Sequence, residues 1–199
     1  MAGIPLERRL QAKTVSTAVA LSGLGTRKGA GTVYRAQLLY VRVMMWLIGR
    51  LLQAASAVDP VIRREVAVLP ADFTFAMRTH SGLSGFALAR DGRRLATRRS
   101  RPDESPTLLF EFKHVTHAFL VLSFVEGTAQ SFANDRMSLG GDAALAMKIV
   151  RCLDRLEVVV LPRFIAERGV KHYPDIGLAT KLGLALRIYR RFLMDLFGG

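Results

Sequence analysis

The sequence predicts an α+β protein in which a sheet formed by the middle of the chain is flanked by long helices. Half of the 199 residues are hydrophobic, which is enough for a sizeable core. Residues 69–139 contain several short runs in which apolar and polar residues alternate, as is typical of strands. Residues 31–58 and 175–197 instead place apolar residues at helical spacing.

The chain is strongly basic. Its 29 Lys and Arg residues outnumber 16 Asp and Glu residues, which gives a net charge of +13. The first 64 residues and the segment 90–101 are the most basic parts. Such charge is either a solvated face or a surface for phosphate, on lipid headgroups or nucleic acid. Because the 90–101 cluster contains no aromatic residue for base stacking, we expect anionic lipid rather than nucleic acid.

The N-terminal region predicts a basic arm, and the cysteine content predicts a cytoplasmic protein. Residues 1–30 are rich in Ser, Thr and Gly around a weakly apolar stretch, which predicts a flexible arm, with a targeting peptide as the alternative. The single cysteine, Cys152, cannot form an internal disulfide, and this favours a reducing compartment. We therefore expect a cytoplasmic protein that is peripheral to the membrane.

Residues 31–58 predict the strongest helix of the chain. Arg35, Arg42 and Arg50 recur on one side, and the rest of the circumference is apolar. The longest uncharged run is only Val43–Gly49, so we do not expect the helix to span a bilayer. It either packs on a core or lies along a membrane surface. Asp59-Pro60 ends it.

Short strands follow from residue 73. Residues 73–78 alternate, residues 85–90 and 94–97 flank the hairpin signal Asp91-Gly92, and residues 107–112 form a further strand. The apolar run at 114–125 fits either a strand or a buried helix.

The segment 136–154 predicts a strand that turns directly into a helix. Residues 136–139 alternate, Gly140 and Gly141 permit a tight turn, and Asp142 is a suitable N-cap. A phosphate site at this turn is not expected, because the Lys-Ser/Thr of a P-loop is absent and Asp142 would repel an anion. The following helix has an apolar face formed by Leu145, Ala146, Ile149, Val150 and Leu153.

Residues 175–197 predict a second amphipathic helix, with Leu184 and Ile188 on its polar side. It either docks on its own domain or a dimer partner, or contacts a membrane as a lid over a cavity. Its predicted apolar face consists of Leu178, Leu182, Ala185, Leu186, Tyr189, Phe192, Leu193, Leu196 and Phe197.

No catalytic centre is evident in the sequence. His114 and His117 lack the further ligands that zinc needs, and packing or surface roles suit them better. Residues 82–86 lack the final glycine of a nucleophile elbow. Cys152 lies beside a helix's apolar stripe and has no activating base. We expect a protein that is not an enzyme and has no cofactor or metal.

The segments around Asp91-Gly92, PTLLFEF, HVTHAFLVLSFVEG, SFAND and RMSLGGDAALAMKIV, in this order, resemble the sterol carrier protein type-two (SCP2) family. Within it, the layout is most similar to bacterial accessory lipid-binding factors of ubiquinone biosynthesis. The resemblance covers about residues 66–155. It implies an SCP2-like sandwich with a mainly antiparallel five-stranded sheet covered by helices, an apolar tunnel, and a helix at 114–125. The long N-terminal helix and the C-terminal extension depart from the family pattern.

The chain is thus expected to comprise a basic arm (1–30), a helical region (31–65), an SCP2-like domain (66–160) and a C-terminal extension (161–199). We expect it to bind or transfer an isoprenoid quinone precursor, a sterol-like molecule or an acyl lipid without catalysis. The alternative is a scaffold or adaptor, at a membrane or on nucleic acid, with a solid core. A homodimer or a partner enzyme complex formed through the terminal helices stays open.

Alternation and helix facing select the candidate residues for lipid binding and for membrane contact. The cavity candidates are Phe75, Phe110, Phe112, Phe119, Leu122, Phe124, Phe132, Met137, Leu139, Met147 and Val150. The membrane candidates are Arg35, Arg42, Arg50, Lys181, Arg187, Arg190 and Arg191.

Overall fold

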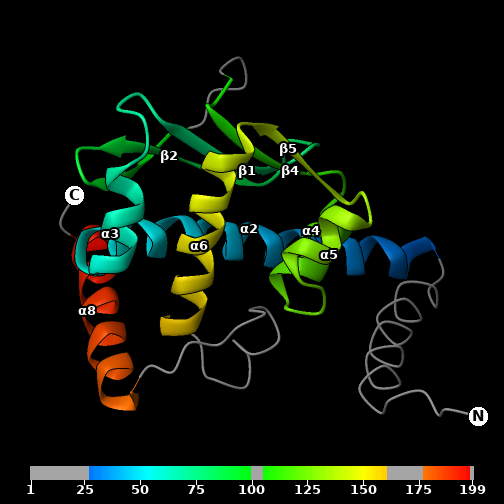
Figure 1. The fold of residues 1–199 in the computed structure, drawn as a ribbon. Helices are drawn as coiled ribbons and strands as arrows, with labels where there is room; N and C mark the ends of the chain where they lie inside the picture. Colours follow the sequence, from blue (N-terminus) through cyan, green and yellow to red (C-terminus); the bar gives the residue numbers. More distant parts are fainter. Residues whose placement is uncertain (1–26, 100–104, 161–176, 198–199) are drawn as a thin grey trace, which may run out of the picture.

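The computed structural model describes residues 27–99, 105–160 and 177–197. They form an α+β fold in which helices pack against one face of a sheet (Figure 1). The predicted arm and the segment 161–176 lie outside the described residues, except that the arm's last four residues begin the first helix. The elements are α2 (Arg27–Val58), α3 (Pro60–Ala67), β1 (Thr74–Thr79), β2 (Gly85–Asp91), β3 (Arg94–Arg98), β4 (Leu108–Phe112), α4 (Val115–Leu122), α5 (Thr128–Ala133), β5 (Met137–Gly141), α6 (Ala143–Val160) and α8 (Leu178–Phe197).

The sheet has five strands in the order β3-β2-β1-β4-β5. β1 and β4 run parallel, and the other three pairs are antiparallel. The mainly antiparallel five-stranded sheet is therefore confirmed. The ambiguous segment 114–125 contains helix α4, as the family resemblance implies.

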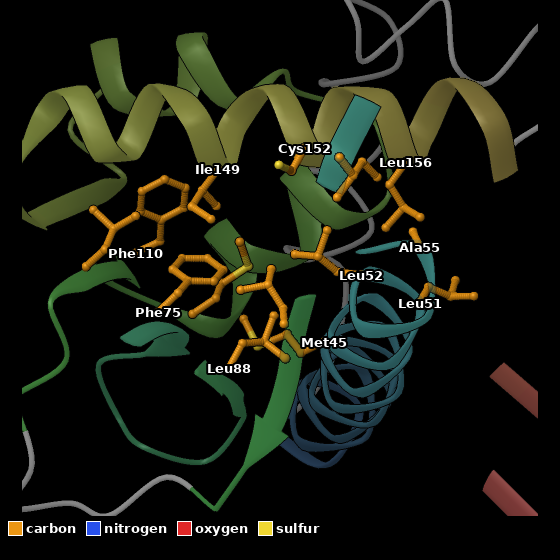
Figure 2. Packing of buried hydrophobic residues seen from close by; sticks show 14 of the residues in the cluster. Met45, Leu51, Leu52, Ala55, Phe75, Leu88, Phe110, Ile149, Cys152 and Leu156 are labelled. Atoms are coloured by element: carbon orange, nitrogen blue, oxygen red, sulfur yellow. The ribbon is translucent and has the colours of Figure 1, made fainter. Parts of the chain in front are cut away.

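The core lies between the sheet and helices α2 and α6. Figure 2 shows Phe75, Leu88 and Phe110 of the sheet facing Met45 of α2 and Ile149 of α6. All five side chains are fully buried, and each contributes roughly 1.5–3 kcal/mol of apolar burial. This layer fixes the two helices on the sheet.

Helix α2 crosses the sheet closely. A Cβ at Gly49 would lie 2.9 Å from the ring of Phe86, so only glycine allows this approach. Among the described residues, Gly31–Val58 is the one segment long and apolar enough to cross a membrane by length and composition. Its apolar character has a packing explanation, because Val41, Met45 and Leu52 are fully buried. Of the two roles left open for this helix, the structure shows core packing.

The turn from β5 into α6 has the predicted chemistry. Gly141 adopts a φ of +110°, and a Cβ there would meet the carbonyl oxygen of Thr107 at 2.3 Å. Asp142 Oδ1 accepts a hydrogen bond from Ala144 N at 2.6 Å, as an N-cap does. The Gly-Gly-Asp sequence therefore lets β5 pass close to β4 and starts α6 at once.

The inner face of α8 differs from the predicted one. Leu184 and Ile188, placed on the polar side by the sequence, are 9% and 0% exposed. Leu186 and Phe197 of the predicted apolar face are 70% and 81% exposed. Phe192 contacts Trp46 of α2 edge-on at 6.0 Å, and Asp195 accepts from Gln53 at 3.2 Å. The prediction was wrong only in part, because Ala185 and Phe192 of the predicted face do pack on the core. Since α8 is apolar around much of its circumference, its packing rather than its periodicity decides which stripe is buried.

Candidate apolar binding cavity

A small apolar cavity lies between the β1–β4–β5 side of the sheet and helices α4, α5 and α6. It encloses about 50 Å³, which is room for a few water molecules. Aromatic, aliphatic and thioether groups form most of the wall. The lining residues are Ile48, Met77, Phe110, Phe112, Val121, Leu122, Phe124, Thr128, Met137, Val150, Leu153, Asp154 and Glu157.

Six of the eleven cavity candidates line this space: Phe110, Phe112, Leu122, Phe124, Met137 and Val150. They meet because β4, β5, α4 and α6 turn their apolar faces toward one another.

The other five candidates lie outside the lining. Phe75 belongs to the solid core and contacts Phe110 edge-on at 5.3 Å. Phe132 packs on the same ring, and Phe119 packs on Tyr40. Leu139 and Met147 are 38% and 55% exposed, respectively, because they lie where the edge strand and the first turns of α6 meet solvent.

Phe124 reaches the cavity through an uncommon backbone conformation. Its φ is +59°, in the left-handed region that glycine favours. It follows Ser123, the C-cap of α4, at a position where helices often carry glycine. The conformation ends α4 and directs an aromatic ring to the cavity wall.

Two carboxyl groups stand at the α6 side of the cavity. Burial raises the pKa of Glu157 to about 7, with a further contribution from repulsion by Asp154. Burial also raises the pKa of Asp154. No hydrogen-bond or ion-pair partner of Glu157 is found in the part of the chain that the structure describes. An otherwise apolar cavity therefore carries one polar edge.

Short links fix the helices that close the cavity. The hydroxyl of Tyr40 donates to the carbonyl oxygen of Leu122 at 3.1 Å, which ties the end of α4 to α2. Beyond α4, the buried Glu126 pairs with Arg136 and accepts from Asn134 at 2.8 Å. The loop around α5 is thus held to the start of β5 by a buried carboxylate.

The residues considered for catalysis are not assembled into a centre. Burial raises the pKa of the Cys152 thiol to about 12, so it is not an activated nucleophile. The rings of His114 and His117 lie 5.1 Å apart, and burial, together with His114, lowers the pKa of His117. Within the described ranges, no three His, Cys, Asp or Glu residues form a group that could hold a metal ion.

The membrane candidates fall in different environments. Arg35 is exposed, Arg42 donates to the carbonyl oxygen of Leu83 at 2.8 Å, and Arg50 is half-buried. Lys181 is 9% exposed. The remaining three lie on α8: Arg187 and Arg190 are exposed, and Arg191 pairs with Asp195 at 3.0 Å.

Sequence reasoning missed seven lining residues: Ile48, Met77, Val121, Thr128, Leu153, Asp154 and Glu157. Leu153 was assigned to the inner face of its helix but not to the cavity. The sequence did contain a signal for Glu157, which directly precedes three valines. Burying its charge in such an apolar segment costs free energy unless the carboxylate has a partner or reaches solvent.

No protein-family model matches the chain, and no curated protein sequence matches it. It is similar to a solved structure titled UbiJ-SCP2 ubiquinone synthesis protein, with 11% identity, a TM-score of 0.43, and coverage of 58% of this chain and 92% of that one. It is also similar to sterol carrier protein 2 like 2 from Aedes aegypti, with 14% identity, a TM-score of 0.31, and coverage of 49% and 94%. Both titles name SCP2, the family that the sequence resembles. At these identities and TM-scores, the likeness carries no statement about function.

Proposed function

We propose that this protein binds an apolar molecule of lipid type between its sheet and helices α4–α6, and presents or transfers it without chemical change. The observation that carries this proposal is the cavity. Side chains from α2, β1, β4, α4, α5, β5 and α6 converge on space that they leave empty, whereas ordinary cores are close-packed. Met77 and Met137 in the wall suit ligands of variable shape.

Binding requires the cavity to widen. Pockets that bind small organic molecules typically enclose about 300–1,000 Å³, whereas this cavity encloses about 50 Å³. The α4–α5 wall is the part that we propose to move, because its helices are only eight and six residues long. Phe124, between them, would turn with this wall. Widening would break the hydrogen bond from Tyr40 to Leu122 that ties the end of α4 to α2.

The cavity chemistry does not choose among an isoprenoid quinone precursor, a sterol-like molecule and an acyl lipid. An accessory role in ubiquinone biosynthesis, implied by the sequence resemblance, stays a prediction. The small enclosed volume favours a second candidate, a scaffold or adaptor protein with a solid core.

The first test is native mass spectrometry of the full chain purified from its host, followed by organic extraction. A bound lipid at one molecule per chain is the expected result. An apo protein that also takes up no fluorescent fatty acid would favour the solid-core scaffold.

A matched pair of α6 variants then locates the site. Val150→Phe places a ring in the cavity, whereas Met147→Phe changes an exposed position about one turn away. We expect Val150→Phe to weaken uptake of the fluorescent fatty acid at least tenfold and Met147→Phe to leave it unchanged, with both variants folded by circular dichroism. Equal uptake by both would place the ligand elsewhere.

A further inference from the structure

Three surface hollows adjoin at the corner where α8, the end of α2, α3 and the β2–β3 hairpin meet. Their volumes are about 530, 360 and 490 Å³. The first is lined by Val58, Leu186, Arg187, Arg190, Arg191 and Met194. The second is lined by Ala57, Arg63, Asp91, Arg93, Arg94 and Arg191. The third is lined by Pro60, Arg63, Arg64, Ala67, Val68 and Arg93.

The hollows form one continuous surface because they share arginines. Arg191 lines the first and second hollows, and both Arg63 and Arg93 line the second and third. Figure 1 shows α3 beside the C-terminal end of α8 at this corner. We call the combined surface the arginine face; it consists of Arg63, Arg64, Arg93, Arg94, Arg187, Arg190 and Arg191.

This face has far more positive charge than its own acids balance. Arg94 pairs with Asp91 at 2.6 Å, and Arg191 pairs with Asp195 at 3.0 Å. The other five arginines have no ion pair with any residue that the structure describes. The acids nearest in sequence to Arg63 and Arg64 are engaged elsewhere: Asp59 pairs with Arg155, and Glu65 pairs with Arg151. The complementary partner therefore carries several negative charges.

Exposed apolar side chains stand among the arginines. Leu186 and Met194 of the first hollow are 70% and 57% exposed, and Val68 of the third is 61% exposed. Guanidinium groups beside exposed aliphatic groups match the boundary between phosphate headgroups and acyl chains. Among the described residues that line the three hollows, none is aromatic, so these residues provide no stacking platform for a single-stranded nucleic acid.

We propose that the arginine face docks this protein on an anionic lipid bilayer, with the arginines on lipid phosphates and Leu186, Met194 and Val68 at the acyl boundary. The face joins α3 and the β2–β3 hairpin to α8, so a single surface combines arginines that lie more than a hundred residues apart in the chain. The inference does not depend on the cavity, and each can fail without the other.

The test measures binding of the full chain to vesicles containing equal amounts of phosphatidylglycerol and phosphatidylcholine, against vesicles of phosphatidylcholine alone. The face variant combines Arg63→Gln, Arg93→Gln and Arg190→Gln, all at exposed positions without ion pairs in the described structure. An arginine at an anionic surface contributes about fivefold in affinity, so the three changes are expected to weaken binding on the order of 100-fold.

The control variant combines Arg99→Gln and Lys148→Gln, which removes two charges away from the face and away from the α2 arginines. Its matched comparison is the double variant Arg63→Gln and Arg93→Gln, whose binding is expected to fall about 25-fold. Binding of the control variant is expected to fall less than tenfold, with unchanged melting temperature for all variants. Equal losses, or a larger loss in the control, would overturn the proposal and place contact elsewhere, including at the α2 arginines. Salt-sensitive binding to single-stranded RNA with no vesicle binding would also overturn it, in favour of nucleic acid.

Discussion

Asp59 joins two helices through one carboxylate. Its Oδ2 accepts a hydrogen bond from Arg155 Nε of α6 at 3.0 Å, and its Oδ1 accepts from Val61 N at the start of α3 at 2.7 Å. Asp59 is fully buried, and the Arg155 side chain is 18% exposed. The turn after α2 is thereby fixed to the helix that carries Leu153, Asp154 and Glu157 into the cavity wall.

Asp59→Ala is expected to lower the free energy of unfolding by about 3–5 kcal/mol, because it removes the N-cap and leaves Arg155 without its acid. Urea denaturation measures the loss. Asp91→Ala is the matched control, since Asp91 pairs with Arg94 at the surface, and its loss should stay below about 1 kcal/mol. Equal losses in the two variants would contradict the structural role of Asp59.

The adjacent glycines before α6 should respond differently to alanine. Gly141→Ala forces a Cβ to 2.3 Å from the carbonyl oxygen of Thr107 at a φ of +110°, and we expect a loss of roughly 2–4 kcal/mol. At Gly140 the new Cβ would lie 3.4 Å from the Leu109 side chain, with no unusual φ. Gly140→Ala should cost less than about 1 kcal/mol. The melting temperatures of the two variants test this difference. A Gly141→Ala variant as stable as Gly140→Ala would contradict the turn geometry.

The strands and the α6 turn were predictable because their signals are local. Alternation sets which residues of β1 and β4 face the helices. Asp91-Gly92 marks the β2–β3 hairpin, although the two turn residues are Gly92 and Arg93 and Asp91 pairs with Arg94. The parallel pairing of β1 with β4 was not predictable from the residues, since it joins strands about thirty residues apart. The segment 114–125 likewise needed the family resemblance, because its apolar run has no distinguishing period.

The buried stripe of α8 shows where periodicity fails. Choosing the most apolar face selected Leu186, yet Leu184 and Ile188 are buried apolar residues of this helix, which packs on α2 and α6. Ile188→Ala should therefore cost about 2–5 kcal/mol, and Leu186→Ala less than about 0.5 kcal/mol. Chemical denaturation of the two variants tests this order. The reverse order would restore the face predicted from sequence.

Only about half of the cavity candidates line the cavity, because packing between elements was again not predictable from the sequence. Facing alone places Phe110 and Phe112 toward the helices and Val150 toward the sheet. It does not distinguish a residue that lines empty space from one that fills the core. Phe75 shares its strand face with Met77, yet only Met77 lines the cavity. Packing between elements makes that difference, and no spacing rule within one element encodes it.

The free-energy cost of the left-handed backbone at Phe124 can be measured separately from the contribution of its ring. Both Phe124→Ala and Phe124→Gly remove the ring from the cavity wall, but only glycine adopts a φ of +59° without steric penalty. We expect Phe124→Gly to be more stable than Phe124→Ala by about 1 kcal/mol. Differential scanning calorimetry provides the comparison. If alanine proves the more stable of the two, Phe124 does not hold the left-handed conformation in solution.

Glu157 should make stability depend on pH in the neutral range. Its pKa is raised from the ordinary 4.5 to about 7 by burial and by Asp154. Between these values the folded state binds more protons than the unfolded state, so the free energy of unfolding falls as pH rises from 4.5 and levels off above 7. The loss is about 2 kcal/mol, allowing for solvent at the cavity edge.

Glu157→Gln isolates this effect because glutamine keeps the shape and cannot ionise. The variant should match the parent below pH 4.5 and exceed it by about 2 kcal/mol above pH 7, as measured by urea denaturation across the range. Asp154→Asn should make the fall smaller and make it end at a lower pH, since it removes the repulsion that helps to raise the folded-state pKa of Glu157. Parallel pH profiles for the parent and Glu157→Gln would mean that water reaches this carboxylate freely, and the cavity would then have an open, wet edge.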